Sequence, residues 1–182
     1  MEQTYAIELK NITKRFGKIV ANDGINLKVK RGEILSLLGE NGSGKTTLMN
    51  MISGIYFPDE GRILVDGKAV SIRSPKDSFD LGIGMIHQHF KLIDVMTAAE
   101  NIILGLKGNA VLDMKKVHKD IQELVDRYGF DLDPAQKVYT MSVSQKQTVE
   151  IVKMLYRGAN ILILDEPTAV LTPQEVDKLF EV

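Results

Sequence analysis

The segment Gly39–Thr47 has the sequence GENGSGKTT, in which three glycines precede a lysine and two threonines. It follows the apolar run ILSLL at 34–38 and precedes LMNMISG at 48–54. The apolar run is typical of a buried strand, and the later segment is typical of a short helix. A strand, a glycine-rich loop and a helix N-terminus in this order predict an anion cradle, because converging backbone N–H groups and the helix dipole attract negative charge.

The residues Gly39-x4-Gly44-Lys45-Thr46 have the spacing of the Walker A phosphate loop. We expect the Lys45 ammonium group to reach the β- and γ-phosphates and the Thr46 hydroxyl to ligate Mg²⁺. The structural alternative is a glycine turn whose lysine is merely solvated. The residues expected to contact the nucleotide here are Gly39, Asn41, Gly42, Ser43, Gly44, Lys45, Thr46 and Thr47.

The composition indicates one folded domain of ordinary size. The chain has 182 residues, of which 44% are hydrophobic and 26% charged, with a formal net charge of −1. This charge argues against a dedicated nucleic-acid-binding protein, which would carry a basic field. The absence of cysteine excludes disulfides and thiolate metal sites. No apolar run approaches the ~20 residues that cross a bilayer, so we expect a cytosolic, soluble chain.

The order of patterns predicts an α/β fold interrupted by a mostly helical block at roughly 90–155. Alternating or continuous apolar runs predict strands at 4–10, 25–30, 34–38, 61–67, 68–72, 81–88 and 160–164. Thr97 with Glu100, and Ser142 with Gln145, have the spacing of helix capping boxes. Helical spacing of apolar residues covers 113–128, and a further helix runs to about Arg157.

Asp165 and Glu166 end the apolar run ILIL, which predicts a central parallel strand. The carboxyl end of such a strand lies beside the phosphate loop. Asp165 would then help to hold Mg²⁺ through water, and Glu166 would polarise the attacking water. The alternative is an acidic loop after an ordinary core strand.

These residues together resemble the ATP-binding cassette (ABC) ATPases over essentially all 182 positions. Phe16 matches the aromatic residue that stacks on adenine in this family, although it could also be a core phenylalanine. Gln88 matches the glutamine that contacts Mg²⁺ and the attacking water and couples to the membrane partner. The segment MSVSQKQ at 141–147 is similar to the family's LSGGQ signature. Ser142, Ser144 and Gln145 would therefore approach ATP bound to a partner cassette, and Ser142 could equally be an ordinary helix cap.

The resemblance implies a P-loop NTPase core with an N-terminal antiparallel β subdomain and an inserted α-helical subdomain. The core would comprise 1–90 and 156–182, and the signature subdomain 91–155. The combination of HQHF at 87–90 and AVLT at 169–172 looks like the subclass that serves simple-sugar and nucleoside importers. That subclass implies Mg-ATP hydrolysis at a head-to-tail pair of cassettes, which are commonly fused in one polypeptide. It also implies permease subunits, an extracellular solute-binding protein, and a location on the inner face of the cell membrane.

The chain departs from the family pattern at several places. Ser144 replaces the second glycine of the signature, and Thr148 stands where an arginine is common, so the composite site using this signature could be slow or degenerate. The chain ends sixteen residues after Glu166, so we expect a C-terminally truncated piece of a longer protein that binds ATP less well than a complete cassette.

None of the three histidines matches the family's γ-phosphate histidine. His87 and His89 flank Gln88 at strand spacing and suggest a metal pair, but no third ligand is evident. His118 lies within the predicted helix at 113–128.

Two other classes of function remain as alternatives. One is a soluble, non-transport ABC-type ATPase, although the long insertions and basic arms of such proteins are not evident in the sequence. The other is a nucleotide-binding regulatory module without efficient hydrolysis, which Ser144 favours and Glu166 argues against. A generic P-loop kinase fits worst, because it would not explain Gln88 and the signature segment together.

Overall fold

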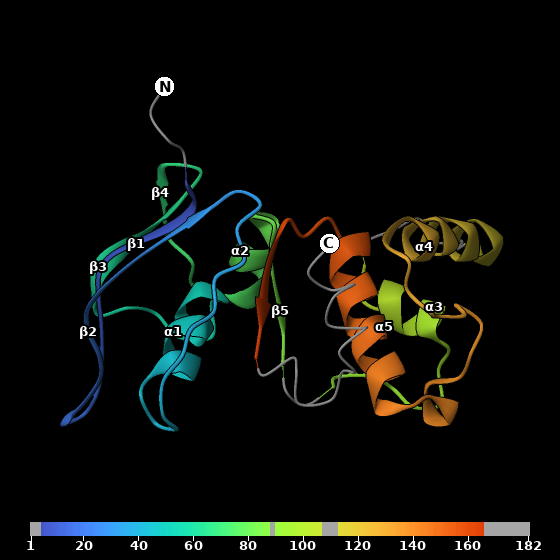
Figure 1. Ribbon diagram of the computed structural model, residues 1–182, viewed down its shortest axis with the longest axis horizontal. Helices are drawn as coiled ribbons and strands as arrows, with labels where there is room; N and C mark the ends of the chain where they lie inside the picture. The colour runs from blue at the N-terminus through green and yellow to red at the C-terminus, as the bar shows by residue number, and fades with distance from the viewer. Residues whose placement is uncertain (1–4, 88–89, 107–112, 166–182) are drawn as a thin grey trace. The chain divides into compact units, whose positions relative to one another are not determined.

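The computed structural model describes residues 5–87, 90–106 and 113–165. The chain consists of two compact units, Met1–Gly84 and Met85–Val182. The elements of both units are labelled in Figure 1.

The first unit is built on a four-stranded antiparallel sheet. Its strands are β1 (Tyr5–Phe16), β2 (Ile19–Lys30), β3 (Glu60–Val65) and β4 (Lys68–Val70), in the order β2-β1-β3-β4. Asp66 and Gly67 join β3 to β4 with φ angles of 50° and 76°, the left-handed pair that a tight hairpin requires. The predicted N-terminal strands and the 61–72 hairpin are therefore confirmed.

Two short helices complete the first unit, and one of them carries the phosphate-loop lysine. Helix α1 (Lys45–Ile52) lies beside the sheet, contacts β2 and buries Leu48, Met51 and Ile52 (Figure 1). Helix α2 (Pro75–Asp80) is linked to it by Ser78, whose buried hydroxyl donates to the Ile52 carbonyl at 3.0 Å. The carboxyl end of α1 is thus held by a hydrogen bond from α2.

The apolar run at 34–38 differs from its prediction, because this structure has no strand there. Ile34, Leu35 and Leu38 are 59%, 40% and 92% exposed. Across the described part of the chain, no backbone hydrogen bond joins this run to another segment. A strand needs a neighbour for its N–H and C=O groups, and an apolar sequence does not specify which segment supplies one.

The second unit contains a helical bundle and a two-stranded sheet. Strand β5 (Ile83–Ile86), whose first two residues belong to the first unit, pairs with β6 (Ile161–Leu164). The helices are α3 (Ala98–Ile103), α4 (Met114–Tyr128) and α5 (Val143–Tyr156), with a 3-10 turn at Val138–Thr140. The predicted strands near 83 and 161 and the predicted helices are confirmed.

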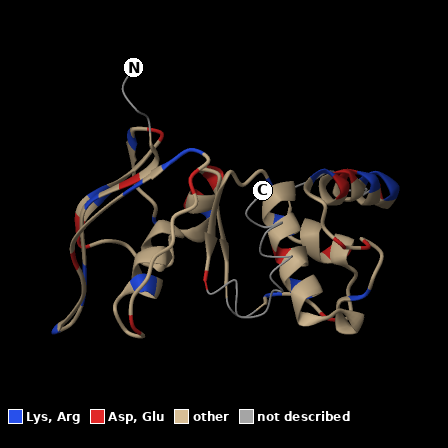
Figure 2. Ribbon diagram, in the orientation of Figure 1, with Lys and Arg blue, Asp and Glu red and all other residues tan. Residues whose placement is uncertain are grey.

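The bundle forms because each helix has one apolar face and a defined start. Its core is formed by Ala98, Ala99, Ile102, Val117, Ile121, Val125, Leu132, Val138, Met141, Val149 and Val152. Both predicted capping boxes are present, with Thr97 Oγ1 accepting the Glu100 N–H at 3.1 Å and Ser142 Oγ accepting the Gln145 N–H at 3.2 Å. Figure 2 shows that basic and acidic residues are interspersed along α4.

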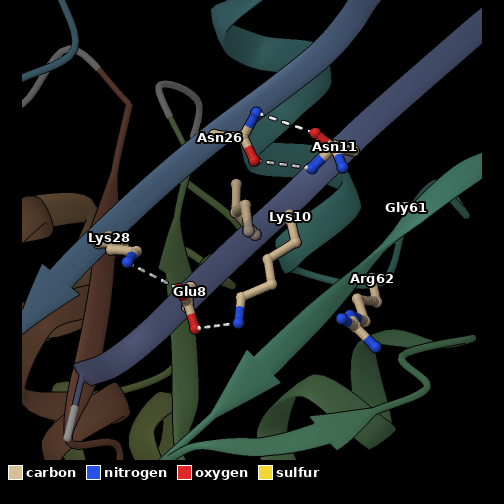
Figure 3. Close-up of a pocket in the computed structure, with 8 residues that line it drawn as sticks. Glu8, Lys10, Asn11, Asn26, Lys28, Gly61 and Arg62 are labelled. Carbon is tan, nitrogen blue, oxygen red and sulfur yellow. Dashed lines mark hydrogen bonds and ion pairs between the residues drawn. The ribbon is translucent and has the colours of Figure 1, made fainter.

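One face of the first unit's sheet carries a pocket of about 620 Å³ around a nearly buried carboxylate (Figure 3). Glu8, which is 9% exposed, forms ion pairs with Lys10 at 3.0 Å and Lys28 at 3.2 Å. The hydrogen bond from Lys10 is the main reason that the pKa of Glu8 lies below its ordinary value, with Lys28 adding to the effect and partial burial opposing it. The pocket is therefore lined by an ion-pair cluster that joins β1 to β2.

We expect Glu8→Gln to lower the melting temperature at neutral pH and to lose this effect in acid. A carboxyl group whose pKa is depressed by folding stabilises the native state above its unfolded pKa, and that contribution disappears as the pH falls through the folded pKa. Thermal unfolding of both proteins at about pH 7 and about pH 3 measures the difference. Glu123→Gln is the matched control, since Glu123 and Lys119 are 3.8 Å apart and both exposed. A Glu8→Gln difference that is equal at both pH values would contradict the account.

Candidate phosphate-binding site

The loop before α1 has a backbone that only glycine adopts readily at two positions. Gly42 and Gly44 have φ angles of 85° and 89°, in the left-handed region. The Ser43 N–H donates to the Glu40 carbonyl at 3.2 Å and closes the turn. Gly39 is also constrained, since an added Cβ would lie 2.8 Å from Ser43 Oγ. The predicted loop residues 39–47 thus lie in one turn and the first residues of α1.

The ammonium group of Lys45 folds back over this loop. Its Nζ donates to the carbonyls of Gly39 at 2.6 Å and Glu40 at 2.8 Å, and it lies 3.4 Å from Ser43 Oγ. These three partners are neutral oxygens, so they hold the charge in place without neutralising it. A positive group kept in this way is suited to an anion.

The beginning of α1 offers further donors. Its N-cap is Gly44, which has no side-chain oxygen, and α1, described along its whole length, has no acidic residue in its first turn. The first N–H groups of a helix have no intrahelical partner, so those of α1 can bind phosphate oxygens. Thr46 is exposed and Thr47 half-buried at this end, which fits a role for the Thr46 hydroxyl as a metal ligand.

Strand β2 lies against the loop where α1 begins. An added Cβ on Gly44 would be 2.4 Å from the Ala21 carbonyl oxygen and 2.9 Å from Asn22 Nδ2. Asn22 Nδ2 donates to the Gly44 carbonyl at 3.3 Å. Sequence reasoning missed Asn22, because the only signal is one polar residue within a strand, and nothing in the sequence indicates that it faces the loop.

Phe16, the residue expected to stack on adenine, ends β1 and is 42% exposed. Its ring meets the edge of Tyr56 with 5.2 Å between centroids and 72° between planes. Lys14 Nζ lies 5.4 Å from the centroid of the same ring. The exposed pair Phe16 and Tyr56 offers aromatic surface to a base, and the stacking role itself stays a prediction.

The signature segment begins helix α5 in the second unit. Ser142 Oγ accepts the Gln145 N–H, and Gln145 Oε1 accepts the Ser142 N–H at 3.0 Å. Ser142 is exposed, and Ser144 is half-buried. Thr148, the second departure from the family pattern, is 8% exposed and its hydroxyl donates to the Ser144 carbonyl at 3.2 Å. Thr148 is therefore bonded to the first turn of its own helix.

The predicted acidic and glutamine residues fall at the edge of the described region. The N–H of Asp165 donates to the Ile86 carbonyl at 3.2 Å, so Asp165 directly follows the paired part of β6, and it is half-buried. Gln88, His89 and Glu166 lie outside the described residues. Thr46 belongs to the first unit and Asp165 to the second, so the role of these residues as Mg²⁺ ligands stays a prediction.

A buried carboxylate connects α5 to the chain segment after β5. Glu150, 6% exposed, accepts the backbone N–H of Lys91 at 3.0 Å and pairs with Lys153 at 3.6 Å. Nearby, burial and then the charge of Lys91 lower the pKa of His87, while Glu150 and Asp165 oppose the shift. His87 is therefore mainly neutral at pH 7, and sequence reasoning assigned no role to Glu150.

Among residues 5–87, 90–106 and 113–165, no group of three or more metal-ligating His, Cys, Asp or Glu side chains is present. His118 lies half-buried on α4. None of the described helices is both long and apolar enough to span a bilayer.

The loop has left-handed glycines, a lysine held by loop carbonyls and a helix start without a side-chain cap. Together these features define a P-loop of the kind that binds nucleotide phosphates. The family model described as ABC transporter matches residues 22–169. The chain therefore belongs to the ABC transporter family.

Curated relatives are similar to this chain over almost its whole length. The chain is 54% identical over 180 residues to the guanosine import ATP-binding protein NupO of Bacillus subtilis, covering 98% of this chain and 35% of NupO. It is 52% identical over 184 residues to the nucleoside import ATP-binding protein NupA of Lactococcus lactis, covering 100% of this chain and 36% of NupA. The chain thus spans about a third of the length of these curated relatives.

A solved structure confirms the fold class. The dimeric post-hydrolysis state of the ATP-binding cassette MJ0796, bound to ADP and Pi, matches with a TM-score of 0.76 and 29% identity. The match covers 95% of this chain and 79% of that one. The predicted P-loop NTPase class is confirmed, whereas the predicted domain boundaries and site roles stay predictions.

Replacing Gly44 by Ala should destabilise the protein more than the same change at Gly42. Both positions have left-handed φ angles, which cost alanine about 1 kcal/mol. At Gly42 an added Cβ meets nothing within 4 Å, whereas at Gly44 it meets the backbone carbonyl of Ala21. We therefore expect a loss of about 1 kcal/mol for Gly42→Ala and about 3 kcal/mol or more for Gly44→Ala. Urea unfolding of the two variants measures the difference, and equal losses would show that β2 does not restrict the loop.

Proposed function

We propose that this chain is the ATP-binding part of an ABC importer, which binds and hydrolyses Mg-ATP to drive uptake of a small solute. The observation that carries the proposal is the Lys45 ammonium group, held over the loop by the Gly39 and Glu40 carbonyls at 2.6 and 2.8 Å. The import functions in the names of NupO and NupA support the transport role. Because those two names specify guanosine and nucleoside, a nucleoside is favoured over a sugar as the solute.

Different residues bind the phosphates, the base, the metal ion and the attacking water. Lys45 and the first N–H groups of α1 bind the β- and γ-phosphates, and Phe16 stacks on the base. Mg²⁺ would be held by Thr46, Asp165 and Gln88, and would supply charge neutralisation of the phosphate oxygens. Glu166 orients and polarises the attacking water, with Gln88 contacting the same water. Phosphoryl transfer needs mainly positioning and electrostatic stabilisation, which these groups provide.

Hydrolysis in this proposal requires a second cassette. Ser142, Ser144 and Gln145 lie at the start of α5, where the helix dipole favours a phosphate oxygen. They would approach ATP bound to the partner cassette, as the dimeric state of MJ0796 supports for this family. The cassette pair would act on transmembrane permease subunits at the cytoplasmic face of the membrane and respond indirectly to an extracellular solute-binding protein.

A second candidate function is a nucleotide-binding regulatory module with little hydrolysis. Ser144 favours it, because its side chain occupies a position where a phosphate needs close access to the backbone. The Walker residues of this chain serve the other composite site, so Lys45, Asp165 and Glu166 remain suited to catalysis. We therefore infer an asymmetric pair with one efficient site and one slow site.

The first test is Mg-ATP binding to the 182-residue chain by calorimetry. Lys45→Ala removes a charge-assisted hydrogen-bond donor worth about 1.5–3 kcal/mol, so the dissociation constant should rise at least about tenfold. Lys68→Ala is the matched control, because Lys68 is an exposed lysine on β4 of the same unit. Equal binding by wild type and Lys45→Ala would contradict the phosphate-loop assignment, and no binding by either would contradict ATP binding by this chain.

The asymmetry is tested in the full transporter. We expect Ser144→Gly to raise ATP turnover several-fold, because removal of the side chain opens the backbone to the γ-phosphate. Thr140→Gly is a comparison that removes a hydroxyl outside the signature. Unchanged turnover in Ser144→Gly would show that the site using this signature is not limited by Ser144.

A further inference from the structure

Asn22 on β2 makes a buried contact with the phosphate loop. The residue is 6% exposed, and its Nδ2 donates to the carbonyl oxygen of Gly44 at 3.3 Å. The same oxygen accepts the Leu48 N–H at 2.9 Å, the first hydrogen bond of α1. The Gly44 carbonyl is thus held by two donors, one from its own helix and one from the neighbouring sheet.

Holding this carbonyl also fixes the next amide group. The peptide bond is planar, and the trans form directs the N–H of Lys45 opposite to the C=O of Gly44. The Lys45 N–H is among the first donors of α1 and has no intrahelical partner. Two bonds to the Gly44 oxygen therefore restrict the direction in which the Lys45 amide presents its hydrogen to a phosphate.

The environment of Asn22 shows that packing alone does not explain an amide here. Its Oδ1 is buried and has no hydrogen-bond partner among the described residues. The buried Asn101, by comparison, makes three hydrogen bonds, two from Nδ2 and one to Oδ1. A leucine has the same branching at Cγ and would leave no polar atom of its own unpaired, so the sheet gains nothing from this oxygen.

The orientation of the amide follows from the same contact. Turning the side chain over would place Oδ1 against the Gly44 oxygen, and two acceptors would face each other. The donor at Nδ2 is therefore the group that the position uses. The amide that supplies this donor also carries Oδ1, which is left unpaired.

We propose that Asn22 is a positioning residue of the phosphate loop, which orients the Gly44–Lys45 peptide toward the phosphates of a nucleoside di- or triphosphate. It does not touch the ligand and acts through the Gly44 carbonyl. The inference rests on the proposed function, because it requires that the loop binds ATP phosphates.

The test compares Asn22→Leu with Asn26→Leu in the 182-residue chain. Asn26 lies on the same strand but is exposed, and its Nδ2 donates to Asn11 Oδ1 and to the Gly24 carbonyl. Mg-ATP binding is measured by calorimetry, and thermal unfolding is measured on the same samples. Loss of the Asn22 hydrogen bond should raise the dissociation constant about three- to tenfold.

Affinity and melting temperature should respond differently in the two variants. Asn22→Leu removes an unpaired buried oxygen, so its melting temperature should stay equal to that of the wild type or rise while its affinity falls. Asn26→Leu should lower the melting temperature and leave the affinity unchanged. If Asn22→Leu lowers affinity and melting temperature together, the residue is structural and the proposal fails.

Asn22→Asp provides a second variant of unchanged size. An ionised carboxylate cannot donate to Gly44 and repels its carbonyl, whereas a protonated carboxyl can donate again. Burial raises the pKa of such a group, so the affinity ratio between wild type and Asn22→Asp should shrink as the pH is lowered. A ratio near one at all pH values would overturn the proposal.

The outcomes separate this inference from the proposed function. If the wild type fails to bind Mg-ATP, both are overturned. If the wild type binds, Lys45→Ala binds at least about tenfold more weakly, and Asn22→Leu binds with wild-type affinity, only the role of Asn22 is overturned.

Discussion

The close approach of strand β2 to Gly44 is the constraint on which the phosphate loop depends. The Ala21 carbonyl lies where a side chain on residue 44 would begin, so the loop must turn into α1 through a glycine in the left-handed region. That turn leaves the first N–H groups of α1 without side-chain caps. It also places Lys45 directly after the turn, with its ammonium group returning to the loop carbonyls.

Local chemistry explains which elements could be predicted. The capping boxes at Thr97 and Ser142, the hairpin at Asp66–Gly67 and the loop before Lys45 each depend on residues within a few positions of one another. Their sequence patterns were therefore sufficient to predict these elements. The roles of Lys45 and Thr46 followed from the spacing of the loop, whereas those of Phe16, Gln88 and the signature segment followed from a family resemblance. The family itself is confirmed by the match over 22–169.

Predictions failed or were missing where the partner is distant in sequence. The run at 34–38 is apolar enough for a buried strand, yet its backbone has no described partner. Asn22 reaches Gly44 across 22 positions, and Glu150 reaches Lys91 across 59 positions. Residue type alone indicates neither contact, because the register of β1 against β2 and the packing of α5 decide which side chains face inward.

The exposed apolar run at 34–38 has a consequence for the colloidal behaviour of the protein. Ile34, Leu35 and Leu38 present large hydrocarbon surfaces next to backbone groups that pair with no described segment. Such segments associate edge to edge between molecules. Self-association should therefore grow with protein concentration and with salts that are excluded from protein surfaces, such as sulfate. Within the first unit, association between molecules would therefore depend on this short run and less on the antiparallel sheet.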